Sequence, residues 1–85
     1  MNVMIPSALH SYTGRSSVEA QGSTLAALLA DLDRRYPGIR FRIVDEQEQV
    51  RRHIRIFING TQEFGLSRPL KDSDEVIIAQ ALSGG

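Results

Sequence analysis

The sequence predicts an α+β fold in which one amphipathic helix covers one face of a mixed β-sheet. Two observations support this prediction. Residues 22–38 carry a leucine pattern with helical spacing, and short segments with alternating apolar residues lie on both sides of it. The chain has 85 residues, which suits one compact domain that buries about 60–65% of its unfolded surface.

The N-terminal part predicts a β-hairpin. Residues 2–10, "NVMIPSALH", indicate a first strand, and Pro6 inside it calls for a bulge or an unpaired position because proline donates no ladder hydrogen bond. Residues 12–14, "YTG", turn the chain, and residues 15–21, "RSSVEAQ", indicate a second strand. The side chains expected to face inward are Val3, Ile5, Leu9, Val18 and Ala20.

The helix is predicted over residues 22–38, "GSTLAALLADLDRRYPG". Ser23 or Thr24 can cap the first amides, two arginines complement the dipole in the last turn, and a Pro-Gly pair ends the helix. One helical face collects Leu25, Leu28, Leu29, Leu32 and Tyr36. This stripe must pack on the flanking strands.

The C-terminal half predicts two more strands. Residues 39–53 form a charged connection to which we assign no element. Residues 53–60, "HIRIFING", indicate a strand with alternate isoleucines on one face and an Asn-Gly turn at its end. Residues 61–74 are expected to be irregular, with turns at Pro69 and at the acidic cluster 72–74. Residues 75–82, "EVIIAQAL", indicate the last strand, with Val76 and Ile78 inward.

This order of elements is that of a β-grasp, or ubiquitin-like, fold. If the first and last strands pair in the middle of the sheet, the helix supplies the crossover and the C-terminus leaves at the end of the sheet. We therefore expect a domain over residues 1–81 and a flexible Gly-Gly tail over residues 82–85.

The tail suggests a chemical role. A terminal carboxylate becomes electrophilic once ATP transfers adenylate to it, and a narrow enzyme channel admits only a chain without bulky side chains. Glycine permits such close backbone approach. In this interpretation Gly85 is the chemical group, Gly84 and the small Ser83 give access, and Leu82 anchors the tail at the domain. The alternative is chance, because two terminal glycines arise in roughly 1 chain in 200.

Two segments, "RRYPGIRFRIVDEQEQVRRHIRIFING" and "PLKDSDEVIIAQALSGG", resemble the MoaD/ThiS family of sulfur carriers, and within it the MoaD-like branch that includes the cysteine-biosynthesis carrier. The resemblance covers most of the chain from the helix onward. It implies a β-grasp fold and a C-terminal glycine that a ubiquitin-activating-type enzyme adenylates with ATP. The adenylate is then converted to a thiocarboxylate that donates sulfur in a biosynthetic step, so these roles fall on Gly85 and Gly84.

The resemblance also implies partners. They are an adenylating and sulfurtransferase enzyme and a sulfur-accepting biosynthetic enzyme. Because no residue follows Gly85 in the sequence, no protease is needed to expose the carboxylate, although a metalloprotease or a desulfurase stays among the partners considered. The chain departs from the branch at Ser73, where glycine is usual, and at residues 80–83, where proline and alanine are common. The second departure bears on the choice of partner.

Strand parity predicts a docking face. If the alternate isoleucines face the helix, Arg55 and Phe57 face away, together with Ile77 and Ala79 of the last strand. An apolar patch rimmed by arginine suits docking onto a partner enzyme. The alternative is that Phe41, Ile43 or Val44 of the unassigned connection folds over this face.

Composition excludes several classes. Ten basic residues balance ten acidic ones, so no net field attracts nucleic acid or a membrane. The chain has no cysteine, which excludes disulfides and thiolate sites and suits the cytoplasm. His10 and His53 lie far apart in sequence, so no metal site is expected. We find no nucleophile–base pair, and expect a monomeric protein cosubstrate without a bound cofactor rather than an enzyme.

The arginines of the connection leave two interpretations open. The arginines at positions 40, 42, 51 and 52 can form a basic strip, or the interleaved acids at positions 45, 46 and 48 can pair with them in a solvated loop. We favour the loop.

Three functions compete. The first is sulfur carriage toward cysteine or homocysteine or another sulfur metabolite, with molybdopterin or thiazole less favoured. The second is a ubiquitin-like modifier joined through Gly85 to lysines of other proteins. The third is a non-covalent docking module in which the glycines are incidental. The activation step is common to the first two, so the tail alone does not separate them.

Overall fold

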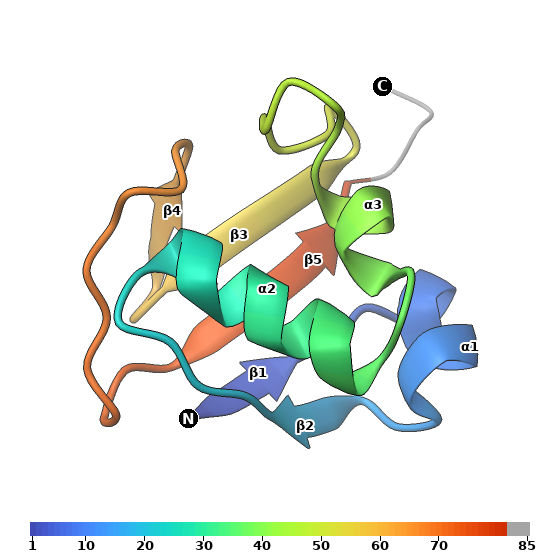
Figure 1. Ribbon diagram of the computed structural model, residues 1–85, viewed down its shortest axis with the longest axis horizontal. Helices are drawn as coiled ribbons and strands as arrows, with labels where there is room; N and C mark the ends of the chain where they lie inside the picture. Colours follow the sequence, from blue (N-terminus) through green and yellow to red (C-terminus); the bar gives the residue numbers. More distant parts are fainter. Residues whose placement is uncertain (82–85) are drawn as a thin grey trace.

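The computed structural model describes residues 1–81 as a five-stranded mixed sheet with helices packed against it (Figure 1). The strands are β1 Asn2–Met4, β2 Ser17–Glu19, β3 Ile54–Ile58, β4 Thr61–Glu63 and β5 Val76–Gln80. The helices are the 3₁₀ helix η1 Ser7–Leu9, α1 His10–Thr13, α2 Leu25–Arg35 and α3 Ile39–Ile43. The strand order is β2-β1-β5-β3-β4, with β1 and β5 parallel and the other pairs antiparallel. The first and last strands thus pair in the middle, and the predicted β-grasp fold is confirmed.

The first strand is shorter than predicted. It spans Asn2–Met4 only. Pro6 adopts extended backbone angles as the N-cap of η1 and lies outside the ladder, so of the two predicted alternatives the unpaired position is found and the bulge is not. The physical reason is that proline cannot donate to the ladder, so pairing with the β2 segment stops at the hydrogen bond from the Ile5 amide to the Ser16 carbonyl, at 2.8 Å. The five side chains expected to face inward are nevertheless all buried. Gly14, at a φ of 71°, then makes the predicted turn into β2.

Helix α2 lies where the leucine pattern predicts it. Of the two candidate caps it is Thr24 that acts, because its hydroxyl oxygen accepts a hydrogen bond from the Ala27 amide at 3.2 Å. All four leucines of the stripe are completely buried, whereas Tyr36 is only partly so. They meet the inner isoleucines and valines of β3 and β5 in a single core. Each buried leucine contributes about 1.5–3 kcal/mol of transfer free energy.

The unassigned connection contains a second short helix. Gly38, at a φ of 96°, lets the chain reverse between α2 and α3. One carboxylate oxygen of Asp33 accepts hydrogen bonds from the amides of Gly38 and Arg40, each at 3.1 Å. Ile39, Ile43 and Val44 are fully buried and close the end of the core. The segment therefore packs as part of the domain.

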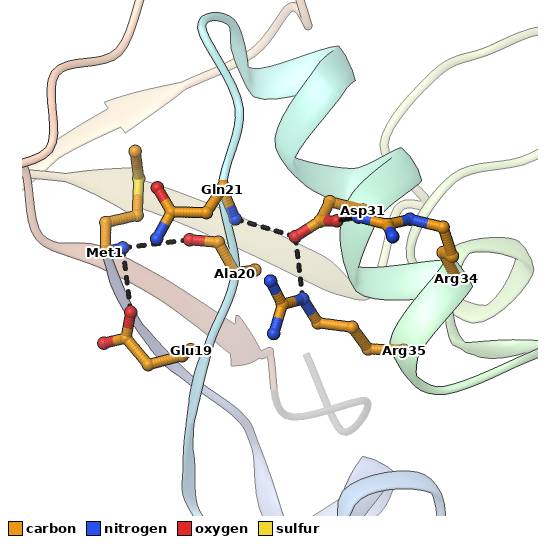
Figure 2. Close-up of polar contacts among 7 residues, drawn as sticks. All are labelled: Met1, Glu19, Ala20, Gln21, Asp31, Arg34 and Arg35. Atoms are coloured by element: carbon orange, nitrogen blue, oxygen red, sulfur yellow. Dashed lines mark hydrogen bonds and ion pairs between the residues drawn. The ribbon is translucent and has the colours of Figure 1, made fainter.

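A buried carboxylate joins α2 to the segment that follows β2 (Figure 2). Asp31 is the buried charged side chain of residues 1–81, at 8% exposure. Its oxygens accept hydrogen bonds from the Gln21 amide and from Arg35 Nε, both at 2.8 Å, and also from Arg34. Beside it, the Met1 amino group donates to the Ala20 carbonyl at 2.9 Å. The N-terminal hairpin and the helix are thus held together by polar contacts as well as by the core.

The turn between β3 and β4 forms at the predicted Asn-Gly pair, whereas the strand β4 that follows it was not predicted. Asn59 and Gly60 have φ values of 52° and 85°, as a two-residue hairpin turn requires. The irregular assignment of residues 61–74 is wrong for Thr61–Glu63, which pairs antiparallel with β3. The polar triplet "TQE" lacks an alternating apolar pattern, so its strand state comes from the hairpin that precedes it.

Asp74 fixes this turn to the start of β5. Its carboxylate accepts hydrogen bonds from the Lys71 amide at 2.8 Å and from the Asn59 side chain at 2.9 Å. These two bonds, that of the Lys71 amide first, hold the pKa of Asp74 below its ordinary value. The carboxylate is therefore more stable in its charged form when the domain is folded.

Gly22 provides a test of the packing between the β2–α2 connection and α2. A methyl carbon at Gly22 would lie 2.3 Å from the Leu28 nitrogen and 2.8 Å from the Ala27 carbonyl carbon, both of them backbone atoms that cannot move aside easily. We expect Gly22→Ala to lower the free energy of unfolding by about 1–3 kcal/mol in urea titrations. Gly65→Ala is the matched control, because no described atom lies within 4 Å of its added carbon. Equal stability of the two variants would contradict the packing.

Asp74 provides a test of the pH dependence. A lowered pKa means that its contribution to stability is present above the unfolded value, about 3.9, and is lost as the pH falls through the lower folded value. We expect Asp74→Asn to flatten the acid side of the stability curve measured by urea unfolding. Asp72→Asn removes the same formal charge from an exposed side chain nearby in the sequence and serves as the control. A steep slope retained in Asp74→Asn would contradict this assignment.

Candidate functional site

The last strand carries the chain out of the domain at one end of the sheet. Gln80 ends β5, and the amide of Ala81 donates a hydrogen bond to the His53 carbonyl at 2.8 Å. This bond fastens the last described residue to the segment that enters β3. The predicted tail residues Leu82, Ser83, Gly84 and Gly85 lie outside the described residues.

The predicted docking residues come together on the face of the sheet opposite α2. The register places Phe57 opposite Ile77, and Arg55 opposite Ala79, and all four are half-buried. On either side Met4 pairs with Ile77, and Gln62 pairs with Phe57. We call this row of Met4, Ile77, Phe57 and Gln62, with Arg55 and Ala79 beside it, the outer face. Strand parity alone predicted its centre correctly.

The connection over residues 39–53 does not cover this face. Ile43 and Val44 are completely buried with the inner isoleucines of β3, in the core between sheet and helices. Phe41 is 56% exposed and lies beneath the guanidinium of Arg51, with its ring centre 4.6 Å from the guanidinium carbon. Figure 1 shows α2 and α3 on the same side of the sheet. The alternative in which one of these three residues folds over the outer face is therefore wrong.

A group of basic side chains surrounds the point where the chain leaves the sheet. Arg42, His53 and Gln80 line a hollow of about 250 Å³, together with Tyr12 of α1. Arg42 Nε donates a hydrogen bond to the Tyr12 hydroxyl at 2.7 Å, which raises the pKa of Arg42 above its ordinary value. The tail exit is thus bordered by a guanidinium, an imidazole and a hydroxyl group.

The ion pairing predicted between arginines and acidic residues of the segment 39–53 is found for one arginine only. Arg40 forms an ion pair with Glu48 at 2.8 Å. Within residues 1–81, Arg42, Arg51 and Arg52 have no carboxylate within ion-pair distance. Asp45 binds the backbone amides of Gln47 and Gln49 instead, at 2.9 and 3.1 Å. The predicted local pairing is therefore found for Arg40 and is absent for these three arginines within the described residues.

The described residues show neither a metal-binding cluster nor a membrane-spanning helix. Residues 1–81 contain no group of three or more His, Asp or Glu side chains placed to hold a metal ion. His10 instead lies with its Nε2 3.1 Å from the Ile5 carbonyl, on the side of the domain where η1 begins. Over the same residues, no helix combines the length and the apolar character that a membrane span needs.

Sequence reasoning missed Phe64, Tyr12 and the position of Arg42. Phe64 is 79% exposed just beyond β4, within a segment expected to be irregular. Tyr12 comes near Arg42 only because α1 and α3 meet beside the end of β5. No local pattern in the sequence signals that meeting.

Comparison with known proteins finds relatives along the whole chain. The model of the ThiS family matches residues 3–85. The sulfur carrier protein CysO of Mycobacterium tuberculosis is 35% identical over 91 aligned positions, covering 100% of this chain and 98% of the relative, and so is CysO of Mycobacterium bovis.

Solved structures also match this chain over nearly its whole length. The structure of Mycobacterium tuberculosis CysO has a TM-score of 0.89 at 34% identity, covering 95% of this chain and 98% of its own. The BexX/CysO complex of Amycolatopsis orientalis gives 0.89 at 36% identity, with 99% and 98% covered. The small archaeal modifier protein 1 of Methanosarcina acetivorans gives 0.79 at 30% identity, with 99% and 94% covered.

Proposed function

Because the chain belongs to the ThiS family, we propose that it is a sulfur carrier, a protein cosubstrate that delivers sulfur as a C-terminal thiocarboxylate in the cytoplasm. The observation that carries the proposal is the match, over its full length, to proteins named sulfur carrier. The same relatives favour cysteine or homocysteine synthesis as the destination of the sulfur. The end of β5 supports it further, because the tail begins where the sheet stops.

The proposed reaction has two steps on Gly85. Its carboxylate attacks the α-phosphorus of ATP in the active site of a separate activating enzyme, which forms an acyl adenylate and releases pyrophosphate. Hydrosulfide then attacks the acyl carbon and expels AMP, which leaves –C(=O)–SH. The domain provides no catalytic group for either step. It acts as a rigid handle, and Gly84 leaves the backbone free of side chains where the enzyme must enclose it.

We propose that the outer face is the surface by which the activating enzyme holds this handle. Phe57 and Ile77 form an apolar centre on rigid, paired strands, and Arg55 lies beside them as a polar rim. Aromatic side chains at the centre of a patch are frequent sites of binding energy. The BexX/CysO complex of Amycolatopsis orientalis is one between a relative and another protein. A sulfur-accepting biosynthetic enzyme is the second partner of this scheme.

A second candidate function is protein modification. It is favoured by the structural similarity to the small archaeal modifier protein 1 of Methanosarcina acetivorans, at 30% identity. The adenylate is common to both functions, but here the acyl carbon would pass to a lysine amine and form an isopeptide bond. The chain has a single lysine, Lys71. Tagging of other proteins is thus favoured over long chains of this protein on itself.

Intact-mass analysis tests the proposed function. The purified protein is incubated with ATP, a sulfide source and each of several ubiquitin-activating-type enzymes. We expect a mass gain equal to the difference between one sulfur and one oxygen atom, lost on removal of ATP and absent in a variant that lacks Gly85. A folded sample with no gain under any of the enzymes would overturn sulfur carriage. High-molecular-mass, isopeptide-linked adducts in cells would support modification instead.

Alanine substitution tests the outer face. We expect Phe57→Ala to raise the KM for the carrier in adenylation by about tenfold or more, with kcat little changed, because a lost aromatic anchor weakens docking and not chemistry. Tyr36→Ala removes another half-buried aromatic ring, on the helix-covered side, and should alter KM by less than about twofold. Urea unfolding of both variants controls for stability. An unchanged KM in folded Phe57→Ala protein would refute docking through this face.

A further inference from the structure

Four arginines at the tail end of the sheet have no carboxylate partner within residues 1–81. They are Arg42, Arg51, Arg52 and Arg55, which we call the arginine collar. The arginines elsewhere behave differently. Arg34, Arg35, Arg40 and Arg68 each form an ion pair with an aspartate or a glutamate, and only Arg15, between α1 and β2, shares the unpaired state within the described part of the chain.

The topology of the sheet brings the collar to the tail exit. Because β3 runs antiparallel to β5, the residues that enter β3 lie where β5 ends. Arg51, Arg52 and His53 line a hollow of about 390 Å³, and Arg51, Arg52 and Arg55 line another of about 200 Å³. Figure 1 shows the loop between α3 and β3 beside the end of β5. A protein that encloses the tail must therefore meet these side chains.

Contacts within the domain hold three of the four guanidinium groups in place. Arg51 Nε donates to the Phe41 carbonyl at 2.7 Å, and one terminal nitrogen of Arg55 donates to the Arg52 carbonyl at 2.6 Å. Arg42 is fixed by its bond to Tyr12. Each bond leaves further N–H groups of the guanidinium for a partner. Arginines that are already ordered lose less conformational entropy when they bind a carboxylate.

Acidic groups of the same region cancel only part of this charge. Asp45 lines one hollow, but its oxygen accepts from two backbone amides, and Glu63 lines another and is paired with Arg68 at 2.7 Å. Glu48 pairs with Arg40, and Glu46 is an exposed neighbour in the loop. The whole chain has a formal net charge of zero, so the excess of positive charge at the tail exit is a local asymmetry.

We propose that the arginine collar docks on an acidic rim that surrounds the tail-receiving channel of the partner protein. This inference rests on the proposed function for the identity of the partner, since it assumes that an enzyme takes up the tail. The chemistry is specific, because ordered guanidinium forks bind carboxylates in a bidentate manner. Opposite charges around the channel would also steer the tail toward it and make the encounter faster.

The collar is tested first without any enzyme. Isotope-labelled protein is titrated at low salt with a short polyglutamate peptide, with a polyglutamine peptide as the neutral control. NMR should show saturable shifts at the side-chain N–H groups of the four collar arginines and none near Lys71 at the opposite end of β5. Added salt should weaken binding several-fold. Shifts spread evenly over all the arginines, or no shifts at low salt, would overturn the proposal.

Matched charge removal sharpens the test. We expect the double variant Arg51→Gln/Arg52→Gln to weaken polyglutamate binding by about three- to tenfold. The double variant Arg15→Gln/Lys71→Gln removes two positive charges outside the collar and should weaken it by less than about 1.5-fold. An equal loss in the two double variants would show that binding depends on overall charge and would refute the collar. A short DNA duplex that binds more tightly than the peptide would also refute it, in favour of a nucleic-acid surface.

The activating enzyme supplies an independent readout. With an enzyme that produces the mass gain, the collar double variant should show a higher KM at low salt that approaches the parent value at high salt, while kcat stays the same. If no enzyme produces the gain, the proposed function fails and the peptide titration still decides the collar. If the gain occurs and the collar double variant keeps the KM of the parent at low salt, the function stands and the collar fails.

Discussion

The parallel pairing of β1 with β5 is the constraint on which the rest of the domain depends. Val3 lies opposite Val76, and Met4 lies opposite Ile77, so the first and last strands lie side by side in the middle of the sheet. Parallel neighbours need a crossover instead of a tight turn, and α2 provides it. Because the crossover passes over one side of the sheet, the leucine stripe is buried there and shares one core with the isoleucines of β3.

The same constraint separates the functional surfaces. With α2 and α3 on one side, the other side keeps its apolar row only partly covered, and strand pairing keeps Phe57 and Ile77 rigidly in place. The direction of β5 carries the chain toward the end where β3 begins and where η1 and α1 lie. In the proposed function, the partner holds the sheet by its outer face and reaches the tail past the arginines.

The parts of the fold that were predicted from the sequence have strong periodic patterns. Helix α2, β3 and β5 each bury one face. Burial of one face places apolar residues about every 3.6 positions in a helix and every 2 positions in a strand, and this spacing can be read from the sequence. Short elements escape this logic. Helix α3 and β4 contain five and three residues, and each owes its state to its neighbours: α3 to Gly38 and the Asp33 carboxylate, β4 to the Asn59-Gly60 turn. Pro6 ends β1 early because proline cannot donate a ladder hydrogen bond. The sequence did not decide between a bulge and an unpaired position, because both accommodate the missing donor.

The candidate site divides along the same line. The centre of the outer face follows from parity within two strands, so the residues themselves reveal it. The collar combines Arg42 of α3 with Arg51, Arg52 and Arg55. Whether these arginines have a carboxylate partner depends on which groups donate hydrogen bonds to Asp45 and Glu48. Interleaved acids and bases in a sequence suggest cancellation. In the folded domain Asp45 closes its own loop, and of the three acids in residues 39–53 only Glu48 forms an ion pair with an arginine, so a chain with zero net charge presents a cationic border where its tail emerges.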